Sequence, residues 1–326
     1  MLNKKIQTLR VIVSTTINLW KAFGISVAKP YFLKNVIFKK DDVLGKEYHT
    51  KQYESLKNAV RSRYSYIIDE FKNQELEKPL DAEDKIENNI WMIWWQGIDE
   101  DTPKTIVKNI ERAKKLHPNW KVNVITKYNY NEFVELPDHM KNHITRGDFS
   151  MTHISDYMRV ILLENYGGIY IDCNFFLLKD LEHVRAYSFY TIKHGRVSKS
   201  HVSKGLWTTG LLAAGKNNVL FSFTKKMYEA FFFDYSFMPS YFFIDAIIGL
   251  GYENIESIRE EIDRVPYNNT HYDFINIMGN EPFDDKRWND IVDDTYALNA
   301  NYKNRFECKK NEKLTFFGHL YLECDD

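Results

Sequence analysis

The chain has 326 residues, of which 44% are hydrophobic and 15% aromatic, enough to bury a full core and to exclude a disordered protein. Its net charge of −1 conceals an asymmetry, because residues 1–40 carry eight Lys or Arg and no Asp or Glu. The rest of the chain has 36 basic and 45 acidic residues, a charge of −9, which argues against a nucleic-acid-binding body.

The N-terminal residues 6–38 are predicted to be helical, because apolar side chains recur there at a helical period: Ile6, Leu9, Val13, Ile17, Trp20 and Phe23. Lysines interrupt the pattern, and no run reaches the roughly 18 to 20 apolar residues that a membrane-spanning helix needs. We therefore expect residues 1–40 to be a basic amphipathic segment that binds an anionic membrane surface. The alternative is a soluble helix that packs on the body.

The cysteines indicate the compartment. The chain has three cysteines, Cys173, Cys308 and Cys324, and their spacing is not that of metal ligands. A small, odd number of cysteines argues against a disulfide scaffold or a zinc site and favours a reducing compartment. Together with the basic N-terminus, this predicts a cytoplasmic protein that is peripheral at the inner face of the plasma membrane.

The next segment, residues 41–85, is predicted to be a helical spacer or a docking helix. Its apolar side chains fall at helical spacing on an otherwise charged surface: Tyr53, Leu56, Val60, Tyr64 and Ile67. Pro79 and the charged run 81–87 indicate its end, so residues 86–326 are expected to form the main domain.

The main domain begins with alternating strand and helix patterns. We predict a strand over 89–95, a helix between Pro103 and Pro118, and a strand over 122–126. This order favours an α/β fold with a mostly parallel sheet flanked by helices, preceded by the N-terminal helical extension. Farther on, we predict a strand over 206–214, helices over 219–233 and 240–250, and a final aromatic strand within 313–323.

Residues 155–174 predict a helix, a glycine turn at Gly167 and Gly168, and a short strand over 169–171. Strand side chains alternate, so Asp172 and Asn174 should project to one side, where their oxygens could hold a divalent cation. The alternative is an Asp that only caps a turn. On the helix, Asp156 and Arg159 are three residues apart and form either a surface salt bridge or a grip on a nucleotide.

This same stretch resembles the signature of sugar transferases with a DXD motif and of capsular polysaccharide synthesis proteins. The residues that carry the resemblance are Ser155-Asp156, Arg159, Leu162-Leu163-Glu164 and the run from Tyr166 to Asp172. Looser similarity at residues 90–97 and 241–245 extends it over roughly residues 88–250. The resemblance implies the GT-A fold and a nucleotide-sugar donor.

The resemblance also implies a donor-binding set, which is Trp95, Gln96, Gly97, Asp156, Arg159 and Asp172. The loop residues 95–97 would border the base. Asp156 and Arg159 would contact the nucleoside and the donor sugar, and Asp172 would bind metal and donor. Asn174 is a departure, because the DXD pattern has Asp there. A Mn²⁺ or Mg²⁺ ion should therefore be held more weakly, or be dispensable.

Three further residues are candidates on weaker grounds. Asp245 lies in an apolar helix, where a carboxylate needs a partner, so it is a second catalytic candidate that could orient an acceptor hydroxyl or act as a base. Trp207 could stack on an acceptor sugar or be an ordinary core residue. His319 could complete the metal shell or be structural.

The resemblance thus predicts a bacterial, membrane-associated glycosyltransferase. It would move a sugar from a nucleotide donor onto a capsular-type polysaccharide or its lipid-linked precursor. The resemblance favours a UDP-sugar as the donor and retention of configuration at the transferred sugar. The alternative, suggested by Asn174, is a catalytically silent relative that binds a glycan or a partner in a synthesis complex. No GxxxxGK[ST], GxSxG or HExxH pattern occurs, so NTPases, serine hydrolases and zincins find no support.

Overall fold

The computed structural model describes residues 2–38, 42–77, 85–147, 150–195 and 200–322. Its centre is a five-stranded sheet in the order β2-β1-β3-β6-β5. The strands are β1 (Asn89–Ile93), β2 (Lys121–Ile125), β3 (Gly168–Ile171), β5 (Phe189–Thr191) and β6 (Leu211–Ala214). The first three are parallel, whereas β6 runs antiparallel to β3 and β5. The predicted α/β class is confirmed.

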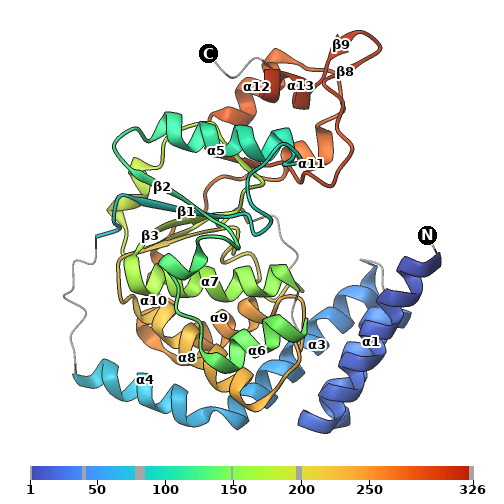
Figure 1. Cartoon of the computed structure of the whole chain (residues 1–326), viewed down its shortest axis with the longest axis vertical. Coiled ribbons are helices and arrows are strands. Elements are labelled where there is room, and N and C mark those ends of the chain that lie inside the picture. Colours follow the sequence, from blue (N-terminus) through green and yellow to red (C-terminus); the bar gives the residue numbers. More distant parts are fainter. Residues whose placement is uncertain (1, 39–41, 78–84, 148–149, 196–199, 323–326) are drawn as a thin grey trace.

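Helices cover both faces of the sheet (Figure 1). Helix α5 (Lys104–Leu116) lies over one face and α7 (Met151–Tyr166) over the other. A further layer packs beneath α7, consisting of α8 (Val219–Asp234), α9 (Phe243–Asn254) and α10 (Glu256–Arg264). Because α7 lies between the sheet and this layer, it is buried along most of its length. The helices predicted over 219–233 and 240–250 are confirmed as α8 and α9.

Two glycines make the tight turn from α7 into β3. Gly167 has φ +63° and Gly168 has φ +98°, a region where other side chains are strained. A Cβ on Gly168 would also lie 2.4 Å from the main-chain oxygen of Asn89. Trp91 of β1 donates from Nε1 to the Gly167 oxygen over 2.8 Å. The turn therefore sets where β3 begins and where Asp172 follows its end.

The strand predicted over 206–214 is shorter in the structure, because β6 begins only at Leu211. The residues before it form a turn, in which the Leu211 N–H donates to the Thr208 oxygen over 3.2 Å. Thr191 Oγ1 of β5 donates to the same oxygen over 3.1 Å. This segment is thus a loop that carries Trp207 toward α9.

The C-terminal residues, together with the strand at residues 175–177 from the middle of the chain, build a small lobe above α5 (Figure 1). It consists of β4 (Phe175–Leu177), β7 (Ala297–Asn299), β8 (Lys309–Lys310), β9 (Lys313–Leu314), α11 (Phe274–Met278), α12 (Asp285–Val292) and α13 (Phe316–Leu322). The predicted aromatic strand over 313–323 is wrong, since α13 occupies most of it. Thr315 Oγ1 accepts from the Gly318 N–H over 2.9 Å and so caps the first turn. Phe316 and Leu320 then fall on one buried face of the helix.

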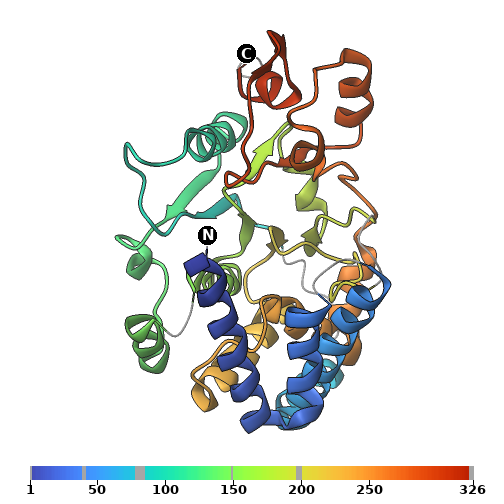
Figure 2. The same ribbon diagram turned by 90° about the vertical axis from the view of Figure 1, so that its right-hand side faces the viewer.

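The N-terminal extension is a group of helices, with α1 outermost (Figure 2). They are α1 (Leu2–Phe23), α2 (Ile25–Phe32), a π-helical turn (Leu33–Ile37), α3 (Val43–Arg63) and α4 (Ser65–Glu77). The stripe predicted on α3 and α4 is buried: Tyr53, Leu56, Val60, Tyr64 and Ile67. The segment therefore packs on the body as a docking helix rather than as a free spacer.

Two features of the extension bear on the predictions for the N-terminal half. Among the described residues, no helix is both long and apolar enough to cross a membrane. The predicted boundary at Pro79, and residues 81–84 of the charged run, lie outside the described residues.

The remaining short elements of the main domain are α6 (Asp138–Arg146) and the 3-10 turns Tyr130–Glu132 and Glu182–Ala186.

Candidate active site

Helix α7 and strand β3 bring four functional side chains together. Arg159 Nη2 lies 3.0 Å from Asp156 Oδ1 and 3.5 Å from Asp172 Oδ1. Tyr170 donates its hydroxyl to the same Asp172 oxygen over 2.6 Å, and the Arg159 guanidinium lies 4.4 Å from the Tyr170 ring centroid. Arg159 Nη1 also donates to the Thr209 main-chain oxygen over 2.5 Å. The side chains of Arg159 and Asp156 are only 5% and 7% exposed, so the pair is buried and is not a surface salt bridge.

Asp172 is the member of this network that reaches solvent. Its side chain is 34% exposed, and the hydrogen bonds that it accepts from described residues fall on Oδ1. The other oxygen, Oδ2, lies against Gly210, where an added Cβ would stand 2.9 Å from it and 2.8 Å from the Phe175 ring. Asp172 is therefore held by the protein through Oδ1, whereas Oδ2 takes part in no hydrogen bond with the described residues.

Asn174 follows two residues later and fits a cation ligand. Its Oδ1 is buried and accepts no hydrogen bond from the described residues, an arrangement that costs free energy unless a ligand uses the oxygen. The Phe175 N–H bonds the Asp172 main-chain oxygen over 2.9 Å, so Asp172 and Asn174 belong to one tight turn. One carboxylate and one amide would make a small ligand set for a cation, which a diphosphate would have to complete.

His319 does not join this set. Its ring stacks on Phe283 with a centroid distance of 3.9 Å and meets Trp288 at 5.0 Å, within the C-terminal lobe. Among the described residues, no group of three His, Cys, Asp or Glu side chains could hold a metal ion. The expectation that His319 completes the metal shell is therefore not met, because α13 directs its ring into an aromatic cluster.

Asp245 and Trp207 come together beside the first network. Trp207 donates from Nε1 to Asp245 Oδ1 over 2.9 Å, and each residue is 3% exposed. Burial and the charge of Asp156 raise the pKa of Asp245 to about 7, against the lowering effects of Trp207 and Arg159. Burial likewise raises the pKa of Asp156 to about 6, although Arg159 lowers it. Trp207 is thus a buried partner of Asp245 and not an exposed platform for a sugar.

The residues predicted to border the base lie in the loop after β1. This strand is parallel to β3 and adjacent to it, so the loop leaves the same edge of the sheet as Asp172. The Trp95 ring centroid lies 5.2 Å from that of Tyr130, and Lys127 N–H donates to the Trp95 oxygen over 3.0 Å. Gln96 is exposed, and Gly97 has φ +96°. The structure therefore places this loop on the same edge of the sheet as Asp172, and no contact between the loop and Asp172 is found among the described residues.

Sequence reasoning missed two tyrosines of the site. Tyr170 had a usable signal, because it lies two residues before Asp172 on one strand and so projects to the same side. Tyr228 of α8 had none. Its hydroxyl is buried without a hydrogen-bond partner among the described residues, and its pKa is raised by burial and by the charge of Asp156. It adds an uncharged group next to the two buried carboxyls.

Comparisons with known proteins place the chain in a family. Residues 37–320 match the family model described as capsular polysaccharide synthesis protein. The O-glycosyltransferase PaGT of Phomopsis amygdali is 30% identical over 115 residues, which are 33% of this chain and 27% of that protein. The O-glycosyltransferase braB of Annulohypoxylon truncatum is 27% identical over 106 residues, 30% of this chain and 25% of that protein. This chain thus spans about a quarter of the length of these fungal relatives.

One solved structure, PaToxG Glycosyltransferase, is 14% identical, with a TM-score of 0.40. That likeness covers 79% of this chain and 100% of the other. The match to the family model covers far more than half of the sequence. On that match, the chain belongs to the capsular polysaccharide synthesis protein family.

Proposed function

We propose that the protein is a glycosyltransferase that moves a sugar from a nucleotide donor to a glycan acceptor. The observation that carries the proposal is the buried network of Asp156, Arg159 and Tyr170, which holds Asp172 and leaves its carboxylate 34% exposed at the carboxyl edge of the sheet. Two relatives named as O-glycosyltransferases support the same class of reaction.

Each residue of the network has a distinct role in this proposal. Asp156 and Arg159 are both buried, so in this proposal they do not contact the donor, contrary to what the resemblance implied. Instead, Asp156 pairs with Arg159, and Arg159 holds the orientation and charge of Asp172. Asp172 and Asn174 would hold a Mn²⁺ or Mg²⁺ ion. When bound, that ion supplies positive charge against the leaving diphosphate. Tyr170 keeps one Asp172 oxygen occupied, so that the other faces the ligand.

The donor and acceptor are proposed at the level of chemical class. The donor is a UDP-sugar whose base lies against the loop of Trp95, Gln96 and Gly97. The acceptor is a capsular-type polysaccharide or its lipid-linked precursor, and configuration is retained at the transferred sugar. Asp245, once ionised, orients an acceptor hydroxyl or accepts its proton.

Asn174 supports a second candidate, a silent relative that binds a glycan or a partner without turnover. The two candidates differ in how a nucleotide binds. A glycosyltransferase should bind UDP more tightly when Mn²⁺ is added, as measured by titration calorimetry, whereas a silent module should show no metal-linked affinity. Hydrolysis of nucleotide sugars by the wild type and by Asp172→Ala tests the proposal directly.

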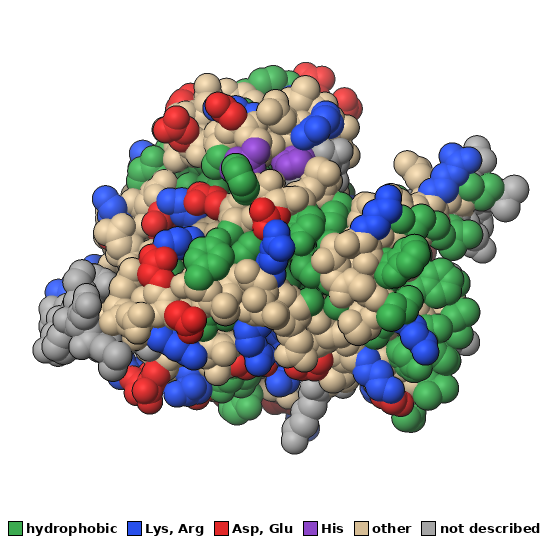
Figure 3. Space-filling model, turned by 90° about the horizontal axis from the view of Figure 1, so that it is seen from below, with side chains coloured by type: hydrophobic (Ala, Val, Ile, Leu, Met, Phe, Trp, Pro, Cys, Tyr) green, Lys and Arg blue, Asp and Glu red, His purple; other side chains and the backbone are tan. Residues whose placement is uncertain are grey.

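We also propose that the extension binds an anionic membrane surface, at the inner face of the plasma membrane. One stripe of α1 is 41% to 59% exposed and consists of Ile6, Leu9, Val13, Ile17 and Trp20. Figure 3 shows hydrophobic side chains with Lys and Arg among them on the lobe where α1 and α2 lie. Because residues 1–40 carry only positive charge, this surface suits anionic headgroups.

Replacing Ile17 and Trp20 with Glu should lower binding to vesicles of phosphatidylcholine and phosphatidylserine by about tenfold or more. The measurement is cosedimentation, with Ile277→Glu as the control, since Ile277 is 69% exposed on the C-terminal lobe. Point variants are preferable to deletion, because deletion would remove Leu19 and Val27 from the core. Equal binding by all three proteins would contradict membrane association through α1.

A further inference from the structure

The loop before α9 places an exposed aromatic residue beside the first turn of α7, the helix that carries Asp156 and Arg159. Tyr241 is 61% exposed, and the charges of Asp156 and Asp172 lie close enough to its phenol to raise its pKa, after the effect of partial burial. Its ring meets the His153 ring edge-on, with a centroid distance of 6.2 Å. An amphipathic aromatic side chain next to carboxylates suits a sugar, which has an apolar ring face and polar hydroxyls.

His153 adds a neutral polar group to this wall. It lies in the first turn of α7, and its Nδ1 is 3.0 Å from the Ser150 hydroxyl. Its Nε2 is buried and has no hydrogen-bond partner among the described residues. Burial lowers the pKa of His153 to about 4, so the imidazole is uncharged at neutral pH. As an uncharged group, it would not attract the diphosphate of a donor.

Helix α3 of the N-terminal extension holds the Tyr241 loop in place. Tyr53 of this helix is 3% exposed, and its hydroxyl accepts from Ser240 Oγ over 2.5 Å and from the Phe242 N–H over 3.2 Å. These two residues flank Tyr241 on either side. Gln52 donates to Ser240 Oγ as well, over 3.4 Å. The backbone at Tyr241 is thus fixed by a helix nearly 190 residues earlier in the sequence.

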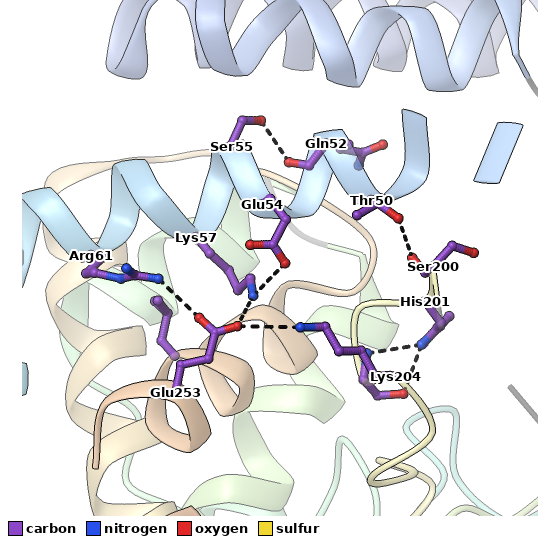
Figure 4. A network of polar contacts seen from close by, with 12 residues as sticks. Thr50, Gln52, Glu54, Ser55, Lys57, Arg61, Ser200, His201, Lys204 and Glu253 are labelled. Atoms are coloured by element: carbon purple, nitrogen blue, oxygen red, sulfur yellow. Dashed lines mark hydrogen bonds and ion pairs between the residues drawn. The ribbon is translucent and has the colours of Figure 1, made fainter. Parts of the chain in front are cut away.

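The same helix is anchored to the end of α9 by ion pairs (Figure 4). Lys57 is 1% exposed and pairs with Glu253 of α9 and, over 2.9 Å, with Glu54. Arg61 reaches the other Glu253 oxygen over 3.1 Å. Lys204, from the loop that leads to Trp207, lies 4.0 Å from Glu253. Helix α3 therefore supports the end of α9 directly and, through Glu253, the loop that leads to Trp207.

We infer that Tyr53 is a positioning residue for the acceptor step. Through Ser240 and Phe242, it holds Tyr241 where, with His153, it receives a hydroxyl-bearing sugar ring next to Asp172. This inference rests on the proposed function and deepens it, because it makes α3 of the extension part of the catalytic unit. The Tyr53 hydroxyl bonds Ser240 and Phe242 and none of the residues proposed to bind the donor, so only acceptor use should depend on it.

The test is Tyr53→Phe, which removes one oxygen and leaves the ring. With the nucleotide sugar that the wild type hydrolyses, we expect the ratio of transfer to a methyl glycoside over hydrolysis by water to fall about tenfold. The affinity for UDP should stay within about twofold of the wild-type value. Tyr241→Ala should show the same split. Tyr66→Phe is the matched control, since Tyr66 is 58% exposed on α4.

A ratio that stays at the wild-type value in Tyr53→Phe would overturn the inference, as would a parallel fall in transfer, hydrolysis and UDP affinity. Hydrogen exchange provides a readout that needs no turnover. The Phe242 amide should exchange faster in Tyr53→Phe than in Tyr66→Phe, and equal exchange would also overturn the inference. If the wild type hydrolyses no donor while this amide behaves as expected, the proposed function fails, and only the finding that Tyr53 holds the Tyr241 loop stands.

Discussion

Replacing Arg159 with Ala is expected to abolish sugar transfer and to lower the free energy of unfolding by about 3 to 5 kcal/mol. Arg159 is buried and is the cation between Asp156 and Asp172. Without it, Asp156 would be a buried carboxylate with no counter-charge, and Asp172 would lose part of its support. The loss of stability follows from the burial, and the loss of activity follows from the displaced carboxylate.

Urea unfolding of Arg159→Ala, together with a donor hydrolysis assay, checks both parts of this prediction. Arg264→Ala is the control, because the Arg264 side chain is 62% exposed and its pair with Glu260 lies on the helix surface. Such a surface pair contributes about 0 to 1 kcal/mol. If both variants unfold at the same urea concentration as the wild type, Arg159 does not have the structural role described above.

Replacing Asp245 with Asn is expected to change activity and stability in opposite directions. Burial and the charge of Asp156 raise the pKa of Asp245 to about 7, so the folded protein holds a proton that the unfolded chain releases near pH 4. Wild-type stability should therefore fall as pH rises from about 4 to about 7. At pH 8, Asp245→Asn should be more stable than the wild type by about 2 kcal/mol, because it removes a cost of order 4 kcal/mol and adds a buried amide.

Transfer by Asp245→Asn should fall by about 100-fold, the lower range for loss of a general base, while wild-type transfer should rise as pH passes through about 7. Thermal unfolding at pH 5 and pH 8 and a pH profile of turnover measure the two effects. Asp138→Asn is the control, since the Asp138 side chain is 93% exposed. An equal change in stability at both pH values would contradict the titration of Asp245 between them.

Local geometry explains why the centre of the site was predictable. A spacing of three on a helix, a double-glycine turn and a two-residue alternation on a strand are sequence-local rules, and they are enough to bring Arg159 to Asp156 and to place Asp172 at a strand end. The same rules located β1, α5 and β2. They say nothing about burial, so the Asp156–Arg159 pair could not be assigned to the interior until α8 and α9 were seen to cover α7.

Contacts between distant segments were not predictable. Trp207 and Asp245 are 38 residues apart, and their hydrogen bond depends on how the loop before β6 meets α9. Tyr53 meets Ser240 across 187 residues. The C-terminal strand was predicted wrongly because aromatic residues favour strands. In the structure, the Thr315 cap and the buried face of α13 stabilise a helix there instead. Because His319 lies on this helix, its ring packs against Phe283 in the C-terminal lobe and does not join Asp172.

Hydrolysis of nucleotide sugars by the wild type and by Asp172→Ala tests the central claim most directly. The wild type should release UDP from at least one member of a panel of UDP-sugars in the presence of Mn²⁺, and Asp172→Ala should release it at least about 100-fold more slowly while unfolding at a similar temperature. Turnover by Asp172→Ala at the wild-type rate would contradict the proposal that this carboxylate is the centre of a glycosyltransferase site.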